Sequence, residues 1–186
     1  RARRVIDGPE CTNFRPSVAM EFYRGCHACA SPRDGTGSLR LLRVLDPCAG
    51  WGDRLLGALA SGVVEHVTLV DPNHLLHSGY ASMAALEPSV VVQTQACPFE
   101  RTNLPRGSYD VVFTSPPFFD KERYYATWSD GQAEARAGPK ARRAWEAAWV
   151  RDWYVPFLDK LAACVAPGGV AALYVCDTTS GRMEKT

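Results

Sequence analysis

The chain has 186 residues, of which 46% are hydrophobic, which is enough for one well-buried domain and too few for two. Its formal net charge of +1 gives no general attraction to nucleic acid, so any basic surface has to be local. No segment reaches the roughly 18 apolar residues of a membrane span, and residues 1–10 contain no hydrophobic signal region. We therefore expect a soluble, intracellular protein with no membrane partner.

Alternating strand and helix patterns predict an α/β fold. Strands are expected at residues 41–46, 66–71, 89–96, 109–115 and 170–175. The first two are followed by helical patterns, and residues 141–165 carry an apolar stripe that Pro156 should kink or split. The sequence PGG at residues 167–169 is expected to turn the chain into the last strand. This order indicates a mostly parallel sheet with helices on both faces.

The seven cysteines are odd in number and lie mostly within apolar strands or helices, which favours reduced thiols. Cys26 and Cys29, in the sequence CHAC, have the spacing of half a zinc site, with His27 between them and Cys11 upstream. No second pair completes such a site. Unligated thiols are therefore favoured over a structural zinc, and we predict no metal.

The segment Asp46–Asp53, DPCAGWGD, places two glycines between a predicted strand and a predicted helix. Glycines at such a turn let a ligand approach the backbone and the helix amides closely. A dinucleotide fingerprint needs a third glycine at position 55, where this chain has Leu55. Asp71 ends the next strand about twenty residues further on, the spacing at which a carboxylate binds ribose hydroxyls in such folds. The alternative is a tight turn that binds no ligand, and the presence of Asp71 makes this alternative less favoured.

The fourth predicted strand runs into TSPPFF, at residues 114–119. Paired prolines cannot continue a strand, because neither has an amide hydrogen for the ladder. The loop after the strand should be rigid and should hold a hydroxyl, a carbonyl and an aromatic ring. Open α/β sheets bind ligands at this end of their strands. A strand exit that only packs against the core is the alternative.

Together these motifs resemble class I S-adenosylmethionine-dependent methyltransferases, and more narrowly the DNA amino-methyltransferases that modify cytosine N4 or adenine N6. The resemblance rests on Asp46-x-x-x-Gly50-x-Gly52, on Asp71, and on SPPF at residues 115–118, which is similar to the family's catalytic tetrapeptide. The segment NFRPSVAMEFY, at residues 13–23, is similar to the one that precedes the family's first strand. The resemblance covers residues 13–176 and implies a Rossmann-like sheet with strand order 3-2-1-4-5, which the family extends by an antiparallel pair.

The resemblance implies S-adenosyl-L-methionine as the cofactor and assigns two groups of site residues. The implied catalytic residues are Ser115, Pro116, Pro117 and Phe118. The Ser115 hydroxyl and the Pro116 carbonyl would accept the hydrogens of the target amine, and Phe118 would stack on the base. Residues 1–40 would close over the cofactor, and residues 41–186 would form the catalytic domain. The implied cofactor-binding residues are Phe14, Pro16, Asp46, Pro47, Ala49, Gly50, Gly52, Asp71, Pro72, Pro98 and Phe99.

Two features depart from the family pattern. After its third strand the family has an acidic residue near the adenine ring, where this chain has Cys97, Pro98 and Phe99, so the Phe99 ring and the backbone are expected to contact the adenine. The family's antiparallel pair has no counterpart after the fifth strand. We therefore expect the apolar strand 170–175 to be capped by residues 1–40, by a second copy in a homodimer, or by sequence cut from a longer protein.

The expected acceptor is the exocyclic amine of a nucleobase, with DNA favoured over RNA. A basic segment after the SPPF loop could contact phosphate, although a solvated helix face explains it equally well. Its basic residues are Arg136, Lys140, Arg142, Arg143 and Arg151. An RNA base or a protein glutamine is the competing acceptor, and a catalytically silent subunit that binds a partner is the competing class. The intact glycines, Asp71 and the tetrapeptide favour an enzyme.

Overall fold

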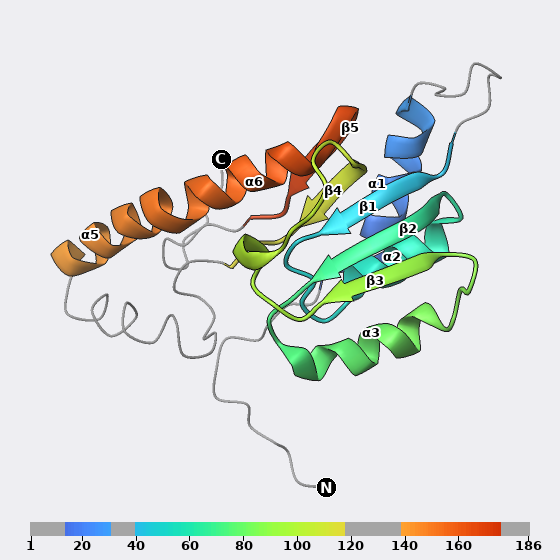
Figure 1. Cartoon of the computed structure of the whole chain (residues 1–186), viewed down its shortest axis with the longest axis horizontal. Helices are drawn as coiled ribbons and strands as arrows, with labels where there is room; N and C mark the ends of the chain where they lie inside the picture. Colours follow the sequence, from blue (N-terminus) through green and yellow to red (C-terminus); the bar gives the residue numbers. More distant parts are fainter. Residues whose placement is uncertain (1–13, 31–39, 118–138, 176–186) are drawn as a thin grey trace, which may run out of the picture.

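The computed structural model describes residues 14–30, 40–117 and 139–175 (Figure 1). Its five strands form one sheet in the order β3-β2-β1-β4-β5, and all neighbouring strands are parallel. The predicted α/β class and the strand order 3-2-1-4-5 are confirmed. The strands are β1 (Leu42–Asp46), β2 (Val64–Val70), β3 (Val91–Gln95), β4 (Tyr109–Thr114) and β5 (Val165–Leu173).

Along the chain, one helix precedes the first strand and the other helices lie between later strands. They are α1 (Pro16–Cys29), α2 (Asp53–Ser61), α3 (His77–Ala84), α5 (Pro139–Trp149) and α6 (Val155–Cys164), with 3-10 turns at His74–Leu76 and Phe99–Arg101. Gly62 ends α2 in the left-handed conformation, with φ of 71°. The Asn73 side chain accepts the Leu75 N–H and so caps the turn that leads into α3. None of the described helices has the length and apolar character needed to cross a membrane.

A hydrophobic core covers each face of the sheet. Successive residues of a strand point to opposite faces, and on β1 Val44 belongs to one core while Leu45 belongs to the other. Helices α1, α2 and α3 cover the first face and α6 covers the second (Figure 1). The predicted helices on both faces are therefore present. Both faces are covered over the central strands β2, β1 and β4, whereas the edge strands β3 and β5 keep exposed residues. Polar groups that bind ligands are therefore expected at the ends of the central strands.

The aromatic stripe of residues 141–165 is divided into two helices. A π-helical turn at Val150–Tyr154 separates α5 from α6, and Pro156 lies in the first turn of α6. Proline has no amide hydrogen for the preceding turn, and the register of the helix changes there. The helical conformation continues through Pro156, so the expected split takes the form of a change of helical register before the proline, and a kink at Pro156 stays a prediction.

Strand β5 differs from its prediction at its start. It begins at Val165, and PGG interrupts the ladder inside the strand instead of forming a turn before it. Tyr109 pairs with Val165 while Val111 pairs with Val170, so β5 carries the extra residues, and Gly168 adopts φ of 76°. Within the described residues no strand pairs with the outer edge of β5. The expected cap on this edge stays a prediction, because residues 1–13 and 176–186 lie outside the described residues.

Helix α1 packs directly on α2 at Gly57. A Cβ atom on Gly57 would lie 2.5 Å from the Ala19 Cβ and 2.6 Å from the Pro16 carbonyl oxygen. Ala19 and Tyr23 of α1 are buried in the same core as β1 and β4. Helix α1 is therefore part of the sheet's own core and is held at a fixed distance from α2.

The α1–α2 contact predicts opposite effects for two glycine-to-alanine changes. Gly57→Ala should lower the free energy of unfolding by about 1–3 kcal/mol, because overpacking outweighs the better helix propensity of alanine. Gly25→Ala on α1 is the matched control, since a Cβ there meets nothing within 4 Å. It should be neutral or stabilising by up to about 1 kcal/mol. Urea unfolding measures both, and equal effects would contradict the close packing.

Candidate functional site

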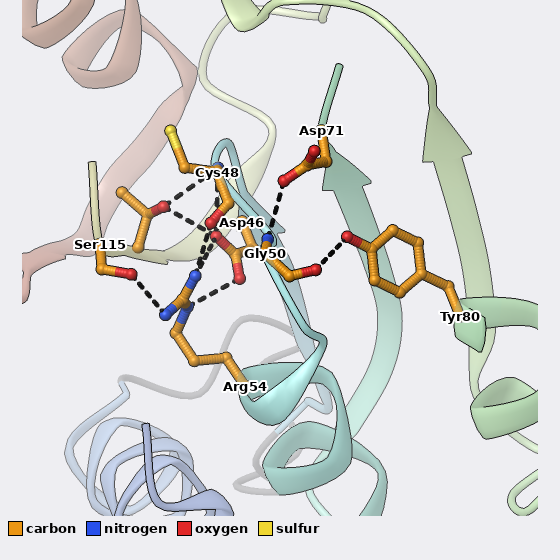
Figure 2. Close-up of polar contacts among 8 residues, drawn as sticks. Asp46, Cys48, Gly50, Arg54, Asp71, Tyr80 and Ser115 are labelled. Carbon is orange, nitrogen blue, oxygen red and sulfur yellow. Dashed lines mark hydrogen bonds and ion pairs between the residues drawn. The ribbon is translucent and has the colours of Figure 1, made fainter. Parts of the chain in front are cut away.

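Polar side chains gather where three neighbouring strands end (Figure 2). Asp46 is the last residue of β1, Thr114 is the last residue of β4, and Asp71 directly follows β2. The loop of residues 47–52 runs from β1 to α2 between them. This edge of the sheet is the place where open α/β folds bind ligands.

Arg54, in the first turn of α2, forms a buried ion pair with Asp46. Its Nε lies 2.7 Å from Asp46 Oδ2, and its Nη2 lies 3.2 Å from Asp46 Oδ1. The same guanidinium donates to the Cys48 carbonyl oxygen at 2.6 Å and to Ser115 Oγ at 2.8 Å. Burial lowers the pKa of Arg54, but the Asp46 carboxylate more than offsets this and the pKa ends above its ordinary value. Arg54 is therefore charged inside the protein.

Thr114 joins β4 to the same network. Its hydroxyl donates to Asp46 Oδ1 at 2.8 Å and accepts the Cys48 N–H at 3.1 Å. Burial raises the pKa of the Cys48 thiol, so this cysteine is neutral. The Asp46 side chain is only 1% exposed and both of its oxygens bind protein donors. The Asp46 carboxylate therefore supports the loop from within the protein, and its contact with a cofactor stays a prediction.

The glycine loop is fixed by β2 and α3. Gly50 and Gly52 have φ of 54° and 86°, which only glycine adopts without strain. The Gly50 N–H donates to Asp71 Oδ2 at 2.9 Å, and its carbonyl accepts the Tyr80 hydroxyl. A Cβ on Gly52 would lie 2.9 Å from Met83 Sδ. Both glycines are therefore required by the shape of the loop, and the loop also contains Pro47 and Ala49, which are buried.

Asp71 lies between the glycine loop and the turn into α3. Besides the Gly50 N–H, it accepts the Asn73 N–H at 2.8 Å through Oδ1. Burial raises the pKa of Asp71, and the two backbone donors partly oppose this shift. The residue is half-buried and Pro72 beside it is exposed. Since a carboxylate offers about four lone-pair sites, Asp71 can accept further hydrogens from a ligand.

The start of α1 reaches this edge of the sheet through Phe14. Its ring contacts the rings of Phe113 and Tyr174 edge-on, with centroid distances of 5.4 Å and 5.3 Å. The Arg54 guanidinium lies 5.9 Å from the centre of the Phe14 ring. Phe14 therefore lies beside the ion pair, and Pro16 begins the helix just after it.

Phe99 is buried in the structure. Its side chain is 3% exposed and packs on Phe157 of α6, with ring centroids 5.3 Å apart. Lys160 lies over the same ring and donates to the Phe99 carbonyl oxygen at 2.7 Å. The ring fills the core beneath α6, and the expected contact of Phe99 with an adenine stays a prediction. The backbone of Pro98, which is half-buried, is still expected to contact an adenine.

The predicted catalytic tetrapeptide is described in part. Ser115 and Pro117 are half-buried and Pro116 is buried, directly after β4 as predicted. Phe118 lies outside the described residues, as do the aromatic residues that follow it. The structure thus brings Ser115 into the network of Asp46 and Arg54, and the role of each residue in the tetrapeptide stays a prediction.

Sequence reasoning missed the contacts of Arg54. The sequence offered only an indirect signal, because Arg54 begins a short helix made mostly of apolar and small residues, and its burial became known from the structure. A charged residue on a helix with so few exposed positions needs a partner of opposite charge. The nearest acidic residue at a strand end is Asp46.

The described parts of the chain contain no group of three or more His, Cys, Asp or Glu side chains that could hold a metal ion. Cys26 and Cys29 carry free thiols at the end of α1. Burial raises the pKa of Cys26, and Cys29 adds to the shift. Cys11, the third candidate ligand, lies outside the described residues.

No protein-family model matches the sequence, and no curated protein sequence matches it. Solved structures do. A SAM-dependent methyltransferase from Agrobacterium tumefaciens aligns with 88% of this chain at 18% identity and a TM-score of 0.54, over 45% of its own length. A SAM-dependent methyltransferase from Leishmania major aligns with 86% of this chain at 19% identity and a TM-score of 0.51, over 50% of its own length.

The CurJ carbon methyltransferase aligns with 89% of this chain at 16% identity and a TM-score of 0.54, over 36% of its own length. The chain has the class I methyltransferase fold. It spans half or less of the length of each of these three structures. The fold places the glycine loop, Asp71 and Ser115 together at the carboxyl edge of the sheet.

The buried ion pair predicts a large loss of stability on removal of one charge. Asp46→Asn should lower the free energy of unfolding by about 3–5 kcal/mol, because Arg54 is left buried without a countercharge. The matched control is Glu21→Gln, which removes the exposed pair of Glu21 with Arg24, 3.0 Å apart. It should cost at most about 1 kcal/mol. Similar losses in urea unfolding for both variants would show that the Asp46 pair contributes no more than a surface pair.

Proposed function

We propose that the protein is an S-adenosylmethionine-dependent methyltransferase that acts on the exocyclic amine of a nucleobase. The observation that carries this proposal is the hydroxyl of Ser115 at the end of β4, held by Arg54 at the same strand edge as the glycine loop and Asp71. The class I methyltransferase fold supports it. S-adenosylmethionine supplies an electrophilic methyl group on a sulfonium when it is bound.

The residues at the ends of β1 and β2 fit such a cofactor. Asp71 keeps lone pairs for two ribose hydroxyls after accepting the Gly50 and Asn73 amides. Gly50 and Gly52 have no Cβ and let the methionine part approach the loop backbone. Asp46 and Arg54 neutralise each other beneath the loop, so neither charge competes for the charged groups of the cofactor's amino acid.

Ser115 and Pro116 fit the acceptor side. An exocyclic amine is a poor nucleophile, because its lone pair is delocalised into the aromatic ring. Two acceptors for its hydrogens, the Ser115 hydroxyl and the Pro116 carbonyl, would make the nitrogen more tetrahedral and turn its lone pair outward. Paired prolines fix the carbonyl in space before the amine arrives, and such pre-organisation raises rates.

The proposed acceptor is cytosine N4 or adenine N6 in DNA. A duplex base has to leave the stack to reach Ser115, and Phe118 next to the prolines offers a ring for stacking once it has. A base in RNA and the side-chain amide of a protein glutamine present an equivalent amine, and they are the competing acceptors. A silent binding subunit is the competing class, and it would not need the hydrogen-bonded Ser115.

Transfer of labelled methyl groups to DNA, RNA and protein tests the proposal. The unchanged protein should label DNA, with the label in N4-methylcytosine or N6-methyladenine after digestion. Ser115→Ala should lower the rate on the order of 100-fold, because one positioned acceptor is lost, and should leave cofactor affinity unchanged. The control is Ser108→Ala at the opposite end of β4, where the hydroxyl donates only to Arg106 O. Label found only in RNA or only in protein would identify that molecule as the acceptor in place of DNA. No label in any pool would overturn the proposal.

Asp71 should control cofactor affinity. Asp71→Asn should weaken S-adenosylmethionine binding by about 2–3 kcal/mol, because an amide cannot accept both ribose hydroxyls. Burial raises the pKa of Asp71, and only its ionised form accepts both hydroxyls. Affinity should therefore fall on acidification, and the fall should begin at a higher pH than an ordinary aspartate would set. Calorimetry at neutral and mildly acidic pH measures both effects.

The Asp71→Asn variant should lose this pH dependence together with its affinity. Asp159→Asn, an exposed change on α6, is the control and should bind S-adenosylmethionine as the unchanged protein does. If Asp71→Asn bound S-adenosylmethionine with full affinity, Asp71 would not be part of the cofactor site.

A further inference from the structure

We propose that Arg54 is a positioning residue for methyl transfer, which holds the Ser115 hydroxyl in register with the glycine loop. This inference rests on the function proposed above and adds a residue to it. Arg54 would touch neither the cofactor nor the acceptor. It would act through Ser115, by fixing where the acceptor amine lies relative to the methyl group.

The contacts of Arg54 connect the two halves of the site. One side of the guanidinium binds Asp46 through Nε and Nη2, and Nη2 also donates to the Cys48 carbonyl oxygen in the glycine loop. The remaining nitrogen, Nη1, donates to Ser115 Oγ at 2.8 Å (Figure 2). A single planar group therefore sets the spacing between the loop after β1 and the exit from β4.

This connection is rigid for three reasons. The guanidinium is planar, so the direction to Ser115 is set once the Asp46 pair has formed. Arg54 is 4% exposed, so water does not compete for its donors. The ring of Phe14 covers it at 5.9 Å, a distance at which a cation and an aromatic face attract each other.

The bond from Arg54 also decides what Ser115 offers to a ligand. A serine hydroxyl has two lone pairs and one hydrogen. Arg54 has only donors, so it always occupies one lone pair and never takes the hydrogen. One lone pair remains to accept a hydrogen of an amine, and the bond to Arg54 limits it to the two other tetrahedral directions of the oxygen. Without that bond the hydroxyl on a half-buried loop residue could take other rotamers.

A double-mutant cycle between Arg54 and Ser115 tests the inference. Arg54→Lys keeps a positive charge for Asp46, but one ammonium cannot also reach the Cys48 carbonyl and Ser115 in the geometry of a guanidinium. Its kcat for methyl transfer should fall about 10- to 100-fold through misplacement of the acceptor. Its calorimetric affinity for S-adenosylhomocysteine should stay within about threefold of the unchanged protein, since Asp71 and the glycines are intact.

The decisive comparison is the change Arg54→Lys made in the Ser115→Ala background. If Arg54 acts through Ser115, it should then alter kcat by less than about twofold. A fall as large as in the unchanged background would overturn the inference, and so would unchanged kcat in Arg54→Lys alone. Arg24→Lys is the matched control, because Arg24 also bridges two elements, from α1 to the Ser61 carbonyl at 3.0 Å. It should leave kcat unchanged.

If Arg54→Lys does not fold, a double variant that lacks both buried charges replaces it in the test. Asp46→Asn combined with Arg54→Gln removes both buried charges and the donor to Ser115 together. It takes the place of Arg54→Lys in the cycle, with the same expected and opposing results. Absence of methyl transfer by the unchanged protein overturns the proposed function itself, whereas an active unchanged protein with additive variants overturns only the role of Arg54.

Discussion

The ion pair of Asp46 with Arg54 is the interaction on which the arrangement of the site depends. Two opposite charges are buried where β1 ends, and each is stable there only because the other is present. The remaining donors of Arg54 reach the glycine loop and Ser115, and Thr114 attaches β4 to the same carboxylate. The ends of β1 and β4 are thus held at a fixed separation by side chains as well as by the strand ladder.

The rest of the fold buries this ion pair away from water. Both faces of the central strands β2, β1 and β4 are covered, by α1, α2 and α3 on one side and by α6 on the other. The close approach at Gly57 draws α1 onto α2, and Phe14 before α1 then covers the guanidinium. A buried pair is sensitive to its surroundings, because lower dielectric raises both the attraction within it and the penalty for losing one partner.

Much of the fold was accessible from the sequence, because strand and helix periods, turn residues and caps all agree along the chain. The loop glycines and Asp71 were found by spacing, and the structure places Gly50 in contact with Asp71. What local patterns could not give was the partner of each buried polar group. Arg54 looks like an ordinary helix residue until its burial is known, and Phe99 looks available to a ligand until α6 packs on it. Both depend on contacts between distant parts of the chain.

The most direct test of this account is a crystal structure of the protein with S-adenosylhomocysteine. The ligand should lie across the ends of β1 and β2, with its ribose hydroxyls on Asp71 and its sulfur directed toward Ser115. The bond from Arg54 to Ser115 should persist in the complex. A ligand bound away from Asp71, or a sulfur directed away from the end of β4, would contradict the account.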